Sequence, residues 1–259
     1  MNKIITLTSD FGYRDGFVAQ MKGVVLGINP NVRLIDTTHD IEPFSMLSAA
    51  LVLNGFYRYF PEGSIHLVVV DPGVGSDRRC IVVSSQGHYF VGPDNGVFSF
   101  IYADDNFAEV REIQDHGLIT EKPHPTFHAR DIFAPVAAHL SKGTDFGEIG
   151  CLISNPERIN FPRVVEIERG IEGKVIHIDR FGNLSVNIQS IMLERPIKEI
   201  CLGSLTIQKL SRTFSDVSDH ESVALINSFG LLEIAMNRAS AADRLGVGIG
   251  ARVRVIWQE

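Results

Sequence analysis

Along the first 150 positions, segments with the apolar pattern of a strand alternate with segments that have the apolar spacing of a helix. Three runs rich in β-branched and other apolar residues have the length of buried strands: 4–8, 32–38 and 65–71. Two segments between them have apolar positions three and four residues apart, as a helix requires: 17–28 and 46–60. A hairpin is predicted over 80–85 and 88–92, and a last helix over 131–143. Strands that alternate with helices predict an α/β, Rossmann-like domain with a mostly parallel sheet.

The pattern changes after about residue 155, where a polar, proline-bearing connection begins. Beyond it, short strand-like runs follow one another about every ten residues, with frequent turn residues between them. This spacing is typical of an all-β sandwich or a small barrel. We therefore predict two domains, an N-terminal α/β domain over 1–155 and a C-terminal all-β barrel domain over 163–259.

Composition and charge narrow the class of protein. The 259 residues carry a formal net charge of −7 without a long basic run, which argues against a nucleic-acid partner. Three cysteines lie far apart and lack the C-x-x-C spacing of metal or redox sites. The chain starts directly with a strand, and no apolar run is long enough to span a membrane. We expect a cytoplasmic protein without a membrane partner.

The third strand ends in the most informative motif of the chain. Asp71 follows it directly and precedes a proline and two glycines. A carboxylate at the tip of an apolar strand is costly to bury unless it is paired, and Arg78 and Arg79 follow across the glycine-rich turn. Ligands of open α/β sheets bind where strands end. Asp71 with Arg78 is therefore a candidate for chemistry; the alternative is a carboxylate that caps its own turn.

Asp10 ends the first strand in the same way. A carboxylate there can accept two hydrogen bonds from a ribose diol, whereas the surrounding loop lacks the G-x-G-x-x-G pattern for a dinucleotide. His128 precedes the last predicted helix, and Asp131 lies near its first turn. We assign Asp131 mainly to capping and His128 to chemistry. The other histidines, including His39, are interpreted as structural.

The predicted β domain contributes a second set of polar candidates. Asp179 ends a strand, Phe181 offers an aromatic face, and the amide of Asn183 can pair with the edge of a purine. The alternative is a β-turn that uses aspartate, glycine and asparagine for their turn chemistry. Ser228 and Glu233 are polar groups in an otherwise apolar hairpin. Glu233 either pairs with an ammonium group or faces solvent.

Five segments, taken in order, resemble the S-adenosylmethionine (SAM) hydroxide adenosyltransferase family, whose relatives include adenosyl-fluoride and adenosyl-chloride synthases. The motifs are T-S-D-F-G, V-D-P-G-V-G-S-D-R-R, P-D-N-G, T-F-H-A-R-D and D-R-F-G-N. The resemblance covers almost the whole chain. It implies an N-terminal α/β domain, a C-terminal β-barrel and a homotrimer whose sites lie between subunits.

The resemblance also implies residue roles. Asp71, Arg78 and His128 match the family's water-handling triad. The residues matched to substrate binding are Asp10 for the ribose, Asn183 and Phe181 for the adenine side, and Asp179, Ser228 and Glu233 for the methionine part. No metal and no cofactor are implied, because SAM is the substrate.

The implied reaction is in-line attack of water on the ribose 5′ carbon of SAM, which gives adenosine and methionine. The leaving thioether is neutral and needs no acid, but neutral water needs a base. The sequence leaves open whether Asp71 or His128 takes the proton. One alternative is halide transfer, which a carboxylate at Asp71 disfavours by repelling an anion. Others are a nucleoside-binding protein without turnover, and a metal phosphohydrolase that uses Asp10, Asp71, His128 and Asp131.

Overall fold

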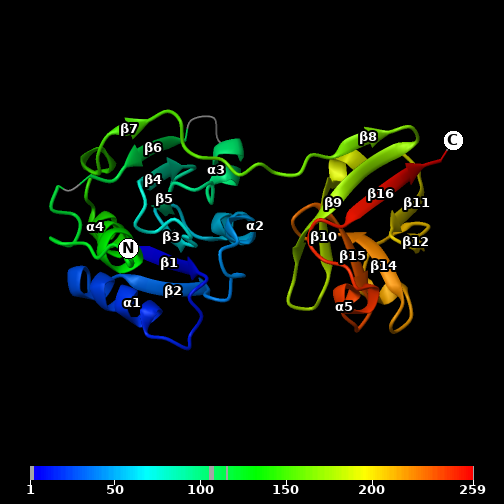
Figure 1. Ribbon diagram of the computed structural model, residues 1–259, viewed down its shortest axis with the longest axis horizontal. Coiled ribbons are helices and arrows are strands. Elements are labelled where there is room, and N and C mark those ends of the chain that lie inside the picture. The colour runs from blue at the N-terminus through cyan, green and yellow to red at the C-terminus, as the bar shows by residue number, and fades with distance from the viewer. Residues whose placement is uncertain (1–2, 105–107, 115, 259) are drawn as a thin grey trace. The chain divides into compact units, whose positions relative to one another are not determined.

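The computed structural model describes residues 3–104, 108–114 and 116–258 (Figure 1). The chain divides into two compact units, Met1–Ile159 and Asn160–Glu259. Each unit has its own apolar core, so each is described separately.

A seven-stranded sheet forms the centre of unit 1, in the order β2-β1-β3-β5-β4-β6-β7. Its strands are β1 (Ile4–Ser9), β2 (Arg33–Thr38), β3 (Ile65–Val69), β4 (Cys80–Ser85), β5 (His88–Pro93), β6 (Glu109–Glu112) and β7 (Leu152–Ile153). The first four in spatial order run parallel, while β4 pairs antiparallel with both β5 and β6. The mostly parallel sheet and the hairpin of β4 and β5 confirm the prediction. The sequence pattern missed β6 and β7, which are short.

Helices cover both faces of this sheet (Figure 1). On one face lie α1 (Phe17–Ile28) and α4 (Ala134–Lys142), whose apolar residues join a core with Leu7 and Leu67. On the other face lie α2 (Met46–Phe56) and α3 (Ser99–Asp104), which pack on Val68 and Phe90. Alternate residues of β3 therefore enter opposite cores, as a doubly covered strand requires.

Two predicted helix limits were wrong. The helix predicted over 46–60 ends at Phe56, where the 3₁₀ turn Tyr57–Tyr59 begins. The helix predicted over 131–143 is preceded by the π-helical turn Ala129–Phe133 and becomes α-helical at Ala134. Apolar spacing continues through both changes of helix type, so it could not mark them.

Unit 2 is a nine-stranded, nearly closed sheet, and this confirms the predicted barrel-like β domain. Its elements are β8 (Val165–Ile167), β9 (Gly170–Ile178), β10 (Leu184–Gln189), β11 (Ile197–Leu202), β12 (Leu205–Ile207), β13 (Leu210–Ser211), β14 (Ser222–Ile226), β15 (Leu231–Met236), β16 (Arg252–Trp257) and the short helix α5 (Ala241–Leu245). The main path runs β12-β11-β16-β9-β10-β15-β14-β13, and β12 also lies close to β14. Inward residues such as Leu184, Ile234 and Val253 fill the interior.

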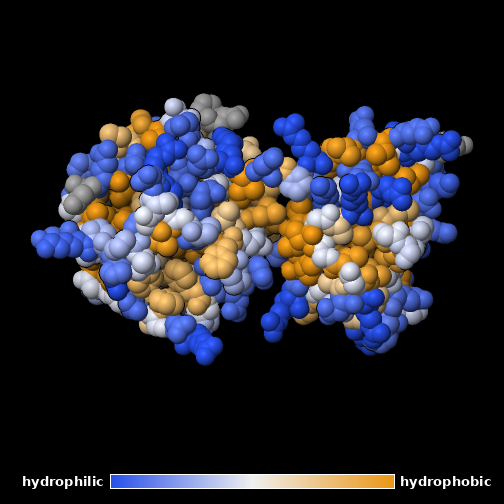
Figure 2. Space-filling view, in the orientation of Figure 1, coloured by the Kyte–Doolittle hydropathy of each residue, from blue (hydrophilic) through white to orange (hydrophobic). Residues whose placement is uncertain are grey.

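Large apolar side chains are exposed among polar ones on the surfaces of both units (Figure 2). In unit 1 they include Tyr13 and Phe44, and in unit 2 Phe181 and Phe229. Among the described residues, no helix combines the length and the apolar character needed to cross a membrane.

Candidate active site

The candidate residues of unit 1 follow neighbouring parallel strands. Ser9, the last residue of β1, is in register with Val69, the last residue of β3. Asp10 follows directly, and Asp71 follows two residues after Val69. Both carboxylates therefore leave the sheet at its carboxyl edge, where open α/β sheets bind ligands.

Asp71, Arg78 and His128 form one hydrogen-bonded cluster. The Arg78 guanidinium grips the Asp71 carboxylate with two nitrogens: Nε donates to Oδ1 over 2.8 Å, and Nη2 donates to Oδ2. Nη2 also donates to Nδ1 of His128 over 2.8 Å. The Asp71 and Arg78 side chains are only 5% and 9% exposed. Forked pairs of this kind are stronger and more directional than ordinary hydrogen bonds.

Every N–H group of Arg78 has an acceptor. Beyond Asp71 and His128, Nη1 donates to Sγ of Cys80 over 3.0 Å and approaches the Arg79 carbonyl at 3.5 Å. The guanidinium also lies over the Phe133 ring, 5.4 Å from its centroid. A guanidinium carries five N–H groups, and these contacts use all of them. Arg78 is therefore held in one orientation.

The hydrogen bond from Arg78 determines the tautomer of His128. A guanidinium only donates, so Nδ1 must be the bare, accepting nitrogen, and the ring proton of neutral His128 lies on Nε2. Burial, followed by the nearby Arg78 charge, lowers the pKa of His128 below its ordinary range. Both effects favour the neutral ring.

Local backbone geometry brings the glycine-rich loop between Asp71 and Arg78 close to the segment that leads to His128. His128 is the residue just before the π-helical turn, a rare element that is frequent at functional sites. The glycine-rich loop approaches the same segment at Gly75, which has φ +80°. A Cβ atom at Gly75 would lie 2.6 Å from the Pro125 carbonyl oxygen, so only glycine fits there.

Asp131 lies in the first turn of the π-helix, as predicted, but its side chain makes no capping hydrogen bond there. The π-helical turn has no side-chain cap, and Asp131 instead pairs with Arg130 and accepts the His124 N–H over 2.9 Å. The hydrogen bond from Arg130 lowers the pKa of Asp131. Asp131 therefore fixes the loop before His128.

Asp10 binds a neighbouring loop. Its Oδ2 accepts the backbone N–H of Phe44 over 3.0 Å. Phe44 has φ +66°, which is uncommon outside glycine and asparagine, and its side chain is exposed. Sequence reasoning did not single out Phe44, whose strain depends on the fold of its loop.

In unit 2, Asp179 and Asn183 close one turn. Oδ1 of Asp179 accepts the N–H groups of Phe181 and Asn183, and Oδ2 accepts the Asn183 amide over 2.9 Å. These are the turn contacts that we gave as the alternative to a binding role. The turn presents the Phe181 side chain, since that residue is 76% exposed.

Glu233 does not face solvent, which corrects one of the two alternatives given for it. It is 6% exposed and lies opposite Ser185 in the pairing of β10 with β15. Its Oε2 accepts the Asn227 amide over 3.1 Å. Burial raises the pKa of Glu233 against the effect of the Asn227 hydrogen bond, and Asp179 adds to the rise. Ser228 is exposed in the β14–β15 turn.

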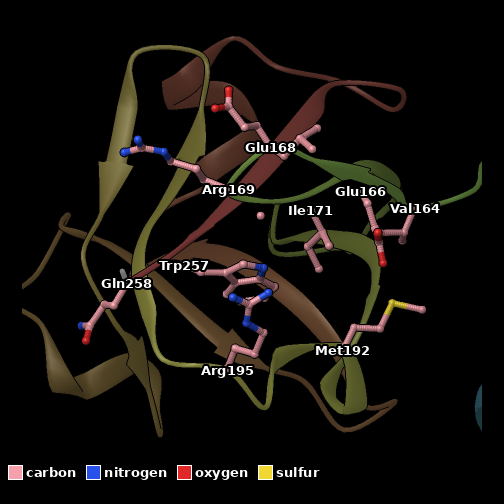
Figure 3. Close-up of a pocket in the computed structure, with 11 residues that line it drawn as sticks. Val164, Glu166, Glu168, Arg169, Ile171, Met192, Arg195, Trp257 and Gln258 are labelled. Atoms are coloured by element: carbon pink, nitrogen blue, oxygen red, sulfur yellow. The ribbon is translucent and has the colours of Figure 1, made fainter.

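A separate pocket of about 700 Å³ lies elsewhere on unit 2 and contains none of the predicted residues (Figure 3). The Arg195 guanidinium lies over the Trp257 ring there, 5.5 Å from its centroid. The pocket borders the first residues of β9, whereas Asp179 follows the last. Among residues 3–104, 108–114 and 116–258, no group of three or more histidine, cysteine or acidic side chains is arranged to hold a metal ion.

Two family models match the chain. Residues 5–150 match the SAM hydroxide adenosyltransferase N-terminal domain, and residues 173–254 match the corresponding C-terminal domain.

Curated relatives align over nearly their full length. The chain is 36% identical to a protein named (R)-S-adenosyl-L-methionine hydrolase from Salinispora tropica, over 97% of each chain. It is 33% identical to a protein of the same name from Methanocaldococcus jannaschii, over 98% of this chain and 96% of that one. A fluorinase from an Actinoplanes species is 29% identical over 98% of this chain and 97% of the relative.

The fold is also found among solved structures. A conserved protein from Thermotoga maritima superposes with a TM-score of 0.90 at 35% identity, over 98% of this chain and 99% of that chain.

Proposed function

Since this chain belongs to the SAM hydroxide adenosyltransferase family, we propose that it is an enzyme that hydrolyses SAM to adenosine and methionine. The names of the relatives from S. tropica and M. jannaschii support the (R) sulfonium epimer as substrate. The observation that carries the proposal is the hydrogen-bonded Asp71–Arg78–His128 cluster at the carboxyl edge of the sheet.

Water attacks the ribose 5′ carbon from the side opposite sulfur. The new C5′–O bond forms as the C5′–S bond breaks. The electron pair of the C5′–S bond stays on sulfur, and methionine leaves as a neutral thioether. The sulfonium charge is lost, and one proton is released from the attacking water. Only that proton requires a base.

Asp71 takes the proton. Nδ1 of His128 is occupied by the Arg78 N–H, and Nε2 carries the ring proton, so the neutral ring has no free lone pair in the ring plane. Each oxygen of Asp71 keeps a lone pair beyond the one that Arg78 uses. His128 instead orients Arg78, and Arg78 in turn orients the carboxylate.

Arg78 acts by positioning. Because its five N–H groups already have acceptors, it has none left for a water molecule. Its positive charge offsets the negative charge of the Asp71 carboxylate, whose side chain is buried beside it. Held in this way, Asp71 meets water in a constant geometry. Such positioning lowers the activation free energy of reactions of this kind by several kcal/mol.

The remaining candidates bind substrate. Asp10 accepts the ribose hydroxyls, while Asn183 and the exposed Phe181 contact the adenine side. Asp179, Ser228 and Glu233 hold the methionine part. The buried carboxylate of Glu233, whose hydrogen-bond partners are neutral, supports a place near a positively charged group.

Halide transfer is the second candidate, because fluorinases are related to this chain. A halide is already an anion and needs no base, and a neighbouring carboxylate repels it. Asp71 therefore favours water. The test incubates purified protein with each SAM epimer, with and without fluoride or chloride. We expect adenosine and methionine from the (R) epimer in every case; halogenated adenosine, or no product, would contradict hydrolysis.

We propose further that the protein is a cytoplasmic homotrimer in which unit 1 of one subunit and unit 2 of the next share each site. The family resemblance and the division of the candidates between two units support this. The test mixes inactive Asp71→Asn and Asn183→Ala variants under conditions of subunit exchange. Restored activity is expected; no restoration, or a monomeric mass by light scattering, would contradict sharing.

A further inference from the structure

His39 has three contacts with residues 9–13, the end of β1 and the loop that carries Asp10. It follows β2 and is 1% exposed. Its Nδ1 lies 2.7 Å from Oγ of Ser9, and its carbonyl accepts the Gly12 N–H over 2.8 Å. Its ring meets the Tyr13 ring edge-on, with centroids 5.1 Å apart. The contacts fall on both sides of Asp10, at positions 9, 12 and 13.

The polar neighbours of His39 are consistent with one tautomer of its ring. Nε2 lies 3.3 Å from Oδ1 of Asp36 without a well-aligned hydrogen bond, and a ring proton on Nε2 faces this acceptor. Nδ1 is then the acceptor for the Ser9 hydroxyl. Ser9 Oγ in turn accepts the Phe11 N–H over 3.3 Å. The other oxygen of Asp36 accepts Lys22 Nζ over 2.6 Å and the Tyr13 hydroxyl over 3.2 Å.

Serine, histidine and aspartate in series also make up a nucleophilic triad. That role does not fit here, because Ser9 is fully buried within β1 and its hydroxyl cannot reach a substrate. The series instead ends in backbone groups of the Asp10 loop. Its function is therefore to hold that loop.

The segment after His39 contacts the same loop. The Ile41 N–H donates to the Ser9 carbonyl over 3.3 Å, and the Phe44 N–H donates to Asp10 Oδ2 over 3.0 Å. The backbone on both sides of Asp10 and one of its carboxylate oxygens are thus fixed from residues 39–44. Such support is what a binding carboxylate needs to keep a constant geometry.

We propose that His39 is a positioning residue for ribose binding: by holding Ser9 and Gly12, it fixes the direction of the Asp10 carboxylate between them. The inference rests on the proposed ribose role of Asp10. It assigns a function to a histidine whose sequence context indicated only a structural one.

The test measures binding of adenosine and of 2′,3′-dideoxyadenosine to the full-length protein by calorimetry. His39→Gln keeps a polar group near Asp36 but removes the acceptor for Ser9. We expect it to weaken adenosine binding about tenfold, as the loss of a well-placed hydrogen bond to a charged group does. Binding of dideoxyadenosine should not change, because that ligand lacks the hydroxyls that Asp10 recognises.

Three further variants give the comparison. His39→Asn keeps an acceptor near Ser9 and should retain most of the adenosine affinity. Ser9→Ala should reproduce the loss in His39→Gln, and the two changes together should cost little more than either alone. His139→Gln, on α4, is the matched control and should bind both ligands as the parent does. With (R)-SAM, His39→Gln should raise KM and leave kcat unchanged.

The outcomes separate the two proposals. If the parent fails to discriminate between the nucleosides, or Asp10→Ala discriminates as well as the parent, the ribose role of Asp10 is wrong and the role of His39 is overturned with it. If Asp10→Ala loses discrimination and His39→Gln keeps it, only the His39 proposal is overturned. Equal weakening of both nucleosides by His39→Gln would also overturn it, since general loss of structure acts on both.

Discussion

Nη2 of Arg78 lies 2.8 Å from Nδ1 of His128, and this contact determines which group in the cluster can act as a base. The guanidinium can only donate, so the histidine must accept and its proton must lie on Nε2. In the proposed mechanism, His128 therefore orients Arg78, and the proton from water goes to Asp71, which Arg78 holds through two nitrogens.

The first prediction concerns Asp71→Asn. The amide keeps the shape of the side chain but is a poor base, so turnover should fall at least about tenfold. SAM affinity should stay within a small factor, because Asp71 is assigned to water and not to the nucleoside. Affinity and turnover are measured on one preparation. Unchanged turnover would remove Asp71 from the mechanism.

The second prediction concerns Cys80, which accepts a hydrogen bond from Arg78. Burial raises the pKa of this thiol in spite of Arg78, so it is neutral at pH 7. Cys80→Ala leaves one guanidinium N–H without its acceptor, and we expect kcat to fall by about three- to tenfold with little change in KM.

Cys80→Ser supplies an oxygen acceptor in the same place and is the matched control. It should recover most of the parental kcat. Equal kcat in the parent and in Cys80→Ala would show that the sulfur contact does not position Arg78.

The third prediction concerns stability at low pH. His66 is fully buried, with Nδ1 2.9 Å from Thr6 Oγ1 and Nε2 3.2 Å from Nδ1 of His88. Burial, with a contribution from His88, lowers the pKa of His66 to about 3. Between that value and about 6.5, the unfolded chain binds a proton that the folded chain does not.

Stability is therefore lost as the pH falls through this window, by about 3 kcal/mol for His66 between pH 7 and pH 4. Urea denaturation across the range measures it. His66→Gln cannot titrate and should lose less stability on acidification than the parent. The exposed His116→Gln is the control and should follow the parent. A parental curve no steeper than that of His66→Gln would contradict the assignment.

Much of the secondary structure of unit 1 could be predicted, because it follows from short-range sequence patterns. Apolar runs and helical spacing identify β1, β3 and α1. Asp71 and Arg78 were paired correctly because a turn of only six residues, 72–77, separates them. The composition of a short segment and the spacing of its apolar residues are enough to predict such elements.

The parts that were missed depend on contacts between distant segments. His39 meets Ser9 across 30 positions through the pairing of β1 with β2, and no sequence pattern marks that contact. The burial of Glu233 likewise arises from the pairing of β10 with β15. A lone histidine or glutamate looks the same in sequence whether it is exposed or enclosed.

The central claim is that water attacks the ribose 5′ carbon, and isotope incorporation tests it most directly. Sulfur in SAM is bonded to three carbons, and hydrolysis at each one leaves the new oxygen on a different product. Purified protein is incubated with (R)-SAM in ¹⁸O-labelled water, and the products are analysed by mass spectrometry. We predict one ¹⁸O atom in adenosine and none in methionine. Label in methanol or in homoserine, or adenosine without label, would contradict attack at C5′.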